Sequence, residues 1–169
     1  LAYSSISHAG FIMIGIEAAG HVGDDDGLPS VLLYLIIYSV LVIGTFTVVS
    51  LVSRTGDAGS DLGSFRGLGR QRPALALAMT VFLLAQAGMP ATSGFIAKFG
   101  VITSAAANES YAIAIIAMVA SVVAAVLYLR IMISMWLNDA EAGDDARESV
   151  RVPFTANVVI TLATIFTLL

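Results

Sequence analysis

The chain has 169 residues, of which 58% are hydrophobic and only 12% are charged, and its formal net charge is −4. About a quarter of the residues in soluble domains are charged, so this composition disfavours a soluble globular protein. The sequence contains no cysteine, which excludes disulfides, thiolate metal sites and iron–sulfur ligation by this chain. The acidic balance offers no basic patch, so we expect no nucleic-acid partner.

The hydrophobic residues occur in long runs that predict membrane helices. About 20 apolar residues cross a hydrocarbon core of about 30 Å at about 1.5 Å per residue. We therefore expect an all-α, polytopic transmembrane bundle forming a single membrane domain over 1–169, with lipid around it. We place about five helices, at 1–20, 31–53, 73–107, 111–137 and 153–169. The first run opens without Met and the last stops inside apolar sequence, so we interpret the chain as a portion of a longer subunit.

A polar segment, TGDAGSDLGSFRGLGRQR at 55–72, separates the second and third runs. Its Gly and Ser content predicts irregular surface structure. Four basic residues lie in or beside it: Arg54, Arg66, Arg70 and Arg72. The turns at 21–30 and 108–110 contain no Lys or Arg, so the positive-inside rule places the arginine segment in the cytoplasm. Arg130 is expected to snorkel toward the same side, next to Tyr128.

The third run is too long to be one straight spanning helix. Roughly 34 residues would make a helix of about 51 Å. Its middle, GMPATSG at 88–94, is poor helix material. A hairpin of two short helices and a single helix broken at its centre are both compatible with this pattern. The half after the break has only about 13 residues, too few to span alone, which favours the broken helix. Non-helical backbone at membrane depth requires burial in protein or a wet cavity, so the break is a candidate functional element.

Lys98 is the only lysine in the chain and lies four residues past this break, in GFIAKFG. A buried ammonium at this depth costs several kcal/mol unless it is paired, hydrated or neutral. A group that exchanges readily between the charged and neutral forms is what a reversible proton carrier requires. The alternative is a lysine that snorkels to an interface or forms a static ion pair. The central position of Lys98 disfavours snorkelling and makes it our first candidate for a proton channel.

Two further polar side chains are candidates for a proton path. His8 lies one turn after Ser4, and an imidazole near hydroxyl groups is suited to relay protons because it titrates near neutral pH in water. A purely structural hydrogen bond is the equal alternative for His8. Gln86 either forms an interhelical hydrogen bond or belongs to a hydrated polar path. Tyr34 and Tyr38 are one helical turn apart and could line the same path.

Two stretches resemble a known family. LAYSSISHAGF at 1–11 and AGMPATSGFIAKF at 87–99 are similar to the antiporter-like subunits of respiratory complex I and of multi-subunit cation/proton antiporters. The pairing of SSISH with GF-x-x-KF, and FRGL at 65–68, most resemble subunit N of bacterial NADH-quinone oxidoreductase. Members of that family have fourteen membrane helices, and this chain resembles the last five. Many members have two prolines in the break, whereas this chain has only Pro90.

The resemblance carries further expectations. It implies a discontinuous helix whose lysine, here Lys98, serves in a proton channel. It implies a role in proton transfer for His8 less strongly. It implies a non-redox membrane subunit of an NADH:quinone oxidoreductase in the bacterial inner membrane, coupling quinone reduction to proton transport. No cofactor is expected in this chain, because NADH, FMN, iron–sulfur clusters and quinone would bind partner subunits. The expected partners are adjacent antiporter-like and small membrane subunits.

Two other functions fit part of the pattern. A subunit of a multi-subunit (Mrp-type) cation/proton antiporter would have a similar break, but such sequences often show Gln where this chain has His8. A membrane scaffold without a transport role would leave Lys98 free to change without effect on transport.

Overall fold

The computed structural model describes residues 2–20, 27–53, 62–138 and 152–168, and all regular structure within them is helical. The elements are α1 (Ala2–Ala19), α2 (Gly27–Ser53), the 3-10 helix η1 (Leu62–Phe65), α3 (Leu68–Gln71), α4 (Pro73–Ala87), α5 (Ser93–Ala107), α6 (Tyr111–Trp136) and α7 (Phe154–Leu168). The predicted all-α class is confirmed.

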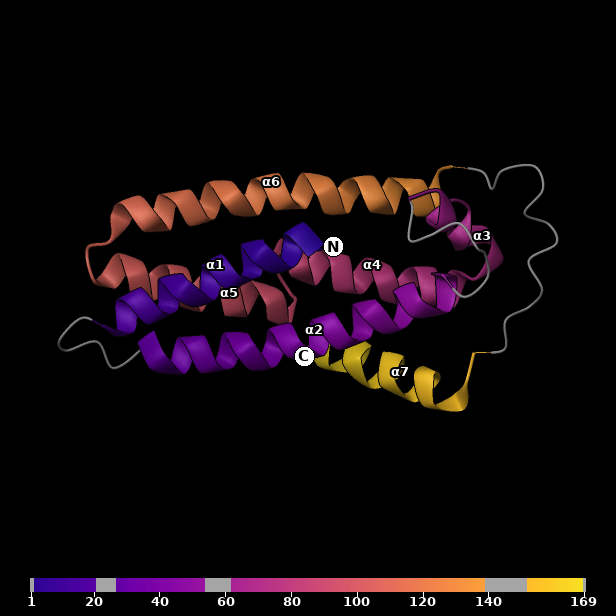
Figure 1. The fold of residues 1–169 in the computed structure, drawn as a ribbon, viewed down its shortest axis with the longest axis horizontal. Helices are drawn as coiled ribbons and strands as arrows, with labels where there is room; N and C mark the ends of the chain where they lie inside the picture. Colours follow the sequence, from indigo (N-terminus) through magenta and orange to yellow (C-terminus); the bar gives the residue numbers. More distant parts are fainter. Residues whose placement is uncertain (1, 21–26, 54–61, 139–151, 169) are drawn as a thin grey trace.

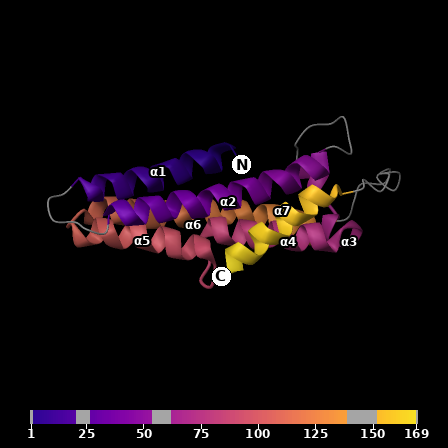
Figure 2. The same cartoon turned by 90° about the horizontal axis from the view of Figure 1, so that it is seen from below.

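The six longer helices run along one common axis and pack side by side (Figure 1). In the view turned by 90°, α5 and α4 again follow one another along this axis, so together they cover the length that α2 or α6 covers alone (Figure 2). The α5–α6 turn lies at one end of the bundle and α3 at the other. The arginines Arg66, Arg70 and Arg72 therefore gather at the α3 end.

Helix length separates the elements into two groups. Among the described residues, α2 and α6 are long and apolar enough to cross a membrane by length and composition. With 27 and 26 residues they extend about 40 Å. The helices α4 and α5 have 15 residues each, or about 22 Å, so neither spans a core of about 30 Å by itself. The pair therefore spans only as one discontinuous helix.

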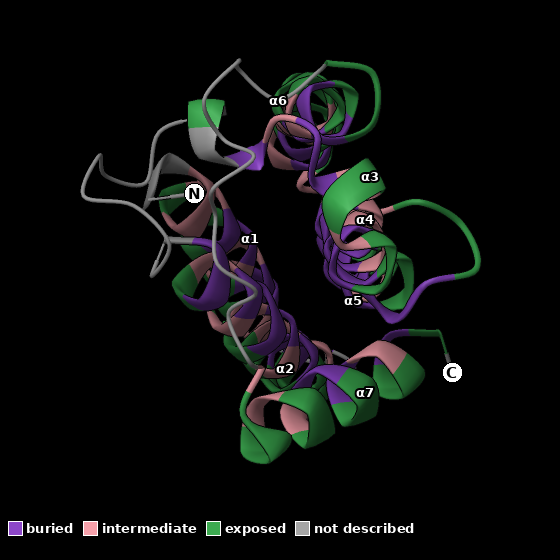
Figure 3. Ribbon diagram, turned by 90° about the vertical axis from the view of Figure 1, so that its right-hand side faces the viewer, coloured by how far each residue is buried: buried purple, intermediate pink, exposed green. Residues whose placement is uncertain are grey.

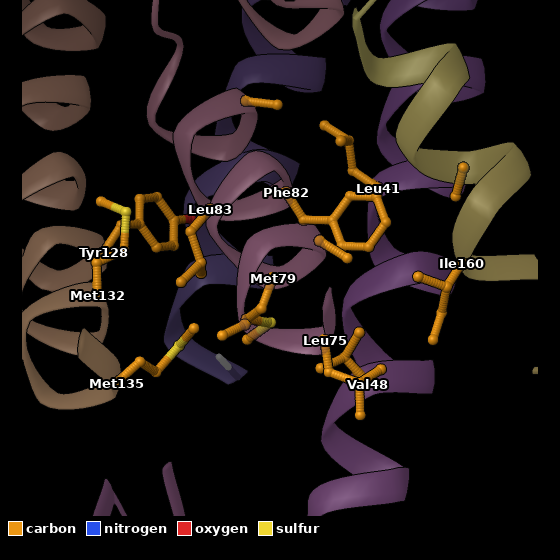
Figure 4. Close-up of a cluster of buried hydrophobic side chains, with 14 of the residues drawn as sticks. Leu41, Val48, Leu75, Met79, Phe82, Leu83, Tyr128, Met132, Met135 and Ile160 are labelled. Atoms are coloured by element: carbon orange, nitrogen blue, oxygen red, sulfur yellow. The ribbon is translucent and has the colours of Figure 1, made fainter. Parts of the chain in front are cut away.

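Helix α4 packs between α6 and α2. Figure 4 shows Phe82 directed toward Leu41 of α2, while Met79 and Leu83 are directed toward α6, where Met135 and Tyr128 lie. Phe82 is fully buried because Gly44 of α2 has no side chain, and a Cβ there would lie 2.5 Å from the Phe82 ring. Burial on both sides fixes α4 as the element against which the break and α5 are positioned.

The outer helices bury one side only. Figure 3, viewed along the bundle, shows buried residues facing the interior and exposed ones on the outside. The buried apolar positions of α6 are three, four or eleven residues apart and therefore fall on one side of the helix, at Ala114, Ala117, Tyr128, Met132 and Met135. Most of the other α6 residues are apolar and exposed, as expected for a helix next to lipid or other membrane helices.

The predicted irregular segment at 55–72 is wrong for its described part, residues 62–72. This part forms η1 and α3, because Phe65 and Leu68 are buried at the end of the bundle. Gly67 between them has a positive φ of 69°, which permits the change of direction. Helix α2 also begins at Gly27, earlier than the predicted 31, because Pro29 is tolerated in a first helical turn. Arg54 lies outside the described residues.

The break between α4 and α5 has a defined backbone. Gly88 ends α4 with a φ of 86°, and its N–H and that of Met89 both donate to the carbonyl of Leu84. This is the hydrogen-bonding pattern of a helix stopped by a left-handed residue. Ala91 also has a positive φ, 69°, which is costly for a residue with a Cβ. The GMPATSG prediction of a broken helix therefore corresponds to two left-handed positions three residues apart.

Substitutions at these two positions are expected to have opposite effects. Gly88→Ala should destabilise the assembled full-length subunit by about 1–2 kcal/mol, because Ala is unfavourable at positive φ. It would also bring a Cβ within 3.0 Å of Cδ of Lys98. Ala91→Gly should be neutral or slightly stabilising, since it relieves the same strain. Thermal unfolding of the two purified variants checks this, and equal destabilisation by both would contradict the assigned backbone.

Candidate functional site

Lys98 lies one turn into α5 and is buried, with 6% of its surface exposed. Its Nζ donates to the carbonyl of Ala87, the last residue of α4, over 3.2 Å. Its ammonium also lies 4.9 Å from the centre of the Phe11 ring of α1, within the range of a cation–π contact. The contacts described for Lys98 are thus a carbonyl and an aromatic face, and not a carboxylate.

The carbonyl of Ala87 is available because α4 stops there. The last carbonyls of a helix lack intrahelical partners and form the negative end of its dipole. A cation placed at this end is stabilised by both effects. In transporters with discontinuous helices, the C-terminal ends of half-helices coordinate cations in the same way. The C-terminal end of α4 at the break therefore stabilises a positive charge in the interior of the bundle, and the Nζ of Lys98 lies at this position.

Close packing of the two half-helices, α4 and α5, brings Lys98 to the C-terminal end of α4. Gly94, in the first turn of α5, lies against Ala85 of α4, and a Cβ at Gly94 would be 1.9 Å from the Ala85 carbonyl oxygen. Only glycine allows this approach. Next to it, the hydroxyl of Ser93 is buried and has no hydrogen-bond partner among the described residues. A buried hydroxyl in this state marks a place where water or another polar group fits.

His8 is the centre of a second polar cluster. Its Nδ1 lies 2.7 Å from the hydroxyl of Tyr34, and its Nε2 lies 3.3 Å from the hydroxyl of Tyr128. The hydroxyl of Tyr128 is in turn hydrogen-bonded to Ser4. The ring of Tyr38 stacks on the imidazole, with centroids 4.5 Å apart. A neutral imidazole donates through one nitrogen and accepts through the other, so His8 connects the two tyrosines in one hydrogen-bonded chain.

A small cavity lies between this cluster and the break. It is bounded by His8, Tyr34 and Tyr38 on one side and by Ala85, Gly94 and Ala97 of the half-helices on the other. Its volume of about 10 Å³ is near the lower limit for a single water molecule. Phe11, whose ring faces the Nζ of Lys98, also stacks on Tyr34, the hydrogen-bond partner of His8. The two first candidates from the sequence thus belong to one site.

Gln86 lies beside this site but is engaged elsewhere. Its Nε2 donates to the hydroxyl of Thr45 of α2 over 2.7 Å, and Thr45 donates to the carbonyl of Leu41. This geometry is that of an interhelical hydrogen bond, one of the two expectations for Gln86. A part for Gln86 in a hydrated path stays a prediction.

At the end of the bundle opposite to α3, the hydroxyl of Ser110 donates to the carboxylate of Glu17. This hydrogen bond joins the α5–α6 turn to α1.

The site also contains a residue that the sequence did not indicate. Tyr128 was interpreted only as a neighbour of a snorkelling Arg130. In the structure Tyr128 is buried against His8 and Ser4, whereas Arg130 is exposed. Residues two apart on a helix do not share a face, so the pairing of Tyr128 with Arg130 is wrong. The i, i+7 spacing of Tyr128 from Ser121 and Met135 on the buried side of α6 is the signal that could have placed it inside.

Apolar helices of membrane-spanning length, a helix broken near its middle and a buried lysine at the break define a polytopic helical membrane protein. Residues 1–124 match the model of the family described as NADH:quinone oxidoreductase/Mrp antiporter, transmembrane. The chain belongs to this family.

Within this family, the chain is similar to proteins named subunit N of NADH-quinone oxidoreductase. The chain is 42% identical over 159 residues to NADH-quinone oxidoreductase subunit N 3 of Streptomyces griseus, covering 94% of this chain and 28% of the relative. It is 41% identical over 146 residues to NADH-quinone oxidoreductase subunit N of Rhodospirillum rubrum, covering 86% of this chain and 29% of that protein. The chain therefore spans less than a third of the length of these two relatives.

A solved structure has the same fold. A chain of respiratory complex I from Thermus thermophilus with bound aureothin superposes with a TM-score of 0.72 at 25% sequence identity. The similarity covers 99% of this chain and 36% of the other. The bundle thus has the fold of about a third of that longer chain.

Proposed function

We propose that this chain is part of a proton-translocating membrane subunit of NADH-quinone oxidoreductase in the bacterial inner membrane. The observation that carries the proposal is the position of Lys98, buried at the break with its Nζ on the terminal carbonyl of α4. Identity of about 40% to proteins named subunit N, over most of this chain, supports the same assignment.

Lys98 would act by gaining and losing one proton. The protonated amine has three donors, of which Ala87 accepts one, so the others require water or a group from outside the described residues. Ser93 offers a hydroxyl at the same break. Loss of the proton leaves a neutral amine that needs no counter-charge, which lowers the cost of burying the group. Changes in charge or hydration nearby would therefore shift Lys98 between the two forms.

His8 would pass protons through a switch of its hydrogen bonds. If Tyr128 donates its proton to Nε2, the proton on Nδ1 can leave toward Tyr34, and the imidazole ends as the other neutral tautomer. One proton enters at Ser4 or Tyr128 and one leaves at Tyr34, so the ring carries no net charge after the step. The water-sized cavity beside Tyr34 continues the path toward α5. The chain of hydrogen bonds itself supports this role.

The redox chemistry would take place in other subunits. This chain has no cysteine for an iron–sulfur cluster. We propose that NADH, FMN, iron–sulfur clusters and quinone bind partner subunits, and that adjacent antiporter-like and small membrane subunits contact this one. The exposed apolar face of α6 suits either such membrane partners or lipid.

A second function is a subunit of a multi-subunit cation/proton antiporter, because the matching family description includes Mrp antiporters. One experiment separates the two. The full-length subunit is tagged, the intact assembly is purified and inserted into vesicles, and acidification is followed. We expect acidification driven by NADH and quinone. Cation/proton exchange on an imposed gradient, without any response to NADH, would overturn the proposal in favour of the antiporter.

Removing the Tyr34 hydroxyl tests the role of the His8 chain. Tyr34→Phe keeps the ring but removes the partner of Nδ1, and we expect proton transport per NADH oxidised to fall while assembly is kept. A lost hydrogen bond of about 1.4 kcal/mol in the transfer step corresponds to about tenfold in rate. Tyr38→Phe is the matched control, because Tyr38 contacts His8 by stacking. Equal transport in both variants would remove Tyr34 from the path.

A further inference from the structure

A groove unrelated to the polar site lies between the first turns of α4 and the side of α7. Its volume is about 550 Å³, and it is open to the outside of the bundle. Leu75, Ala78 and Ile160, all buried, form its floor, and the exposed Leu77 and Ile165 extend its apolar lining. Apolar hollows of this size on a membrane protein face hydrocarbon or another hydrophobic chain.

The groove has one charged end. Arg72 is the only charged residue among the described residues that line it, and it directly precedes Pro73, where α4 begins. Arg66 and Arg70 lie at the same end of the bundle, Arg66 in the turn after η1 and Arg70 on α3. A cluster of arginines at a membrane boundary attracts anionic lipid headgroups, and a guanidinium matches phosphate oxygens with two parallel donors.

The length of the groove fits one leaflet. Its lining on α7 extends from Asn157 to Ile165, nine residues and so about 12 Å along the helix, and Val152 lines it just before the helix begins. Half of the hydrocarbon core is about 15 Å deep, and the tilt of α7 visible in Figure 1 reduces the depth that it reaches. Asn157 adds a polar group at the outer end of the α7 lining, near the level where a lipid carries its ester groups.

We propose that this groove binds one acyl chain of an anionic phospholipid from the leaflet on the arginine-bearing side, with the guanidinium of Arg72 on its phosphate. The apolar floor holds the chain, and the single charge at the boundary selects an anionic headgroup over a neutral one. The site is separate from Lys98 and His8 and does not depend on the function proposed for them.

The test uses the assembled complex with its full-length subunit, in vesicles that contain either photoreactive phosphatidylglycerol or photoreactive phosphatidylcholine. After illumination, labelled peptides of α4 and α7 are quantified. We expect phosphatidylglycerol to label the groove more strongly than phosphatidylcholine, and Arg72→Gln to reduce this labelling about fivefold. Arg130→Gln is the matched control, because Arg130 is exposed on α6 outside the groove.

A second pair of variants tests the groove itself. Thr161→Trp fills it from an exposed position, and we expect groove labelling to be lost while the complex still assembles. Leu162→Trp, on the next residue and outside the lining, should leave the labelling unchanged. If both lipids label the groove equally and Arg72→Gln does not change the labelling, the groove contacts only bulk lipid without selecting a headgroup. Absence of groove labelling in the unaltered complex would show that another polypeptide covers it. Either result overturns the proposal.

Discussion

Replacing Lys98 with methionine in the full-length subunit is expected to leave the complex assembled but to suppress the proton transport that passes through this subunit about a hundredfold. Methionine keeps much of the bulk of the side chain and removes the amine. An unassisted charge at membrane depth costs about 3 kcal/mol, and each 1.36 kcal/mol of barrier is tenfold in rate. The measurement is the number of protons translocated per NADH oxidised in vesicles, together with the yield of intact complex.

Two further variants decide whether Lys98 must change its protonation state. Lys98→Arg keeps a cation that can bind the Ala87 carbonyl, but a guanidinium stays protonated in proteins, so transport should remain suppressed. Arg130→Met removes an exposed cation on α6 and should have no effect. Full transport with Lys98→Arg would mean that the site needs only a fixed positive charge. Full transport with Lys98→Met would support a membrane scaffold instead.

Local features of this fold could be predicted from the sequence, because the information lies within a few residues. The length of 73–107 and the run GMPATSG indicate a break, and α4 ends and α5 begins on either side of its centre. Lys98 then follows at a known distance. The left-handed backbone of Ala91 was not predicted, since alanine carries no local signal for positive φ.

Contacts between distant segments could not be predicted in the same way. Tyr128 reaches His8 across 120 positions in the chain, and Tyr34 across 26. Periodicity shows which side of a helix is buried, but the partner depends on how the helices are rotated and ordered around the bundle. Phe65 and Leu68 show the same limit, because their segment reads as a polar loop until the end of the bundle gives them a surface to cover.

Gly94 is the position where a single added methyl group is expected to damage the fold most. A Cβ at Gly94 would be 1.9 Å from the carbonyl oxygen and 2.6 Å from the carbonyl carbon of Ala85, and both are backbone atoms that no side-chain rotation can move. Gly94→Ala must therefore push α5 away from α4. We expect a loss of about 3 kcal/mol or more in stability, at the upper end for overpacking.

Gly100→Ala, two turns later on α5, is the control for this substitution. A Cβ there would meet only Ser30, its Oγ at 3.5 Å and its Cβ at 3.8 Å, both ordinary contacts, so the exchange of Gly for Ala should be neutral or stabilise the helix. Thermal unfolding of the assembled complex and proton transport are measured for both variants. Because the displacement of α5 also carries Lys98 away from Ala87, Gly94→Ala should reduce transport even in the fraction that assembles. If Gly94→Ala behaves like Gly100→Ala in both measurements, the close approach of the half-helices is not what holds Lys98 at the carbonyl end of α4.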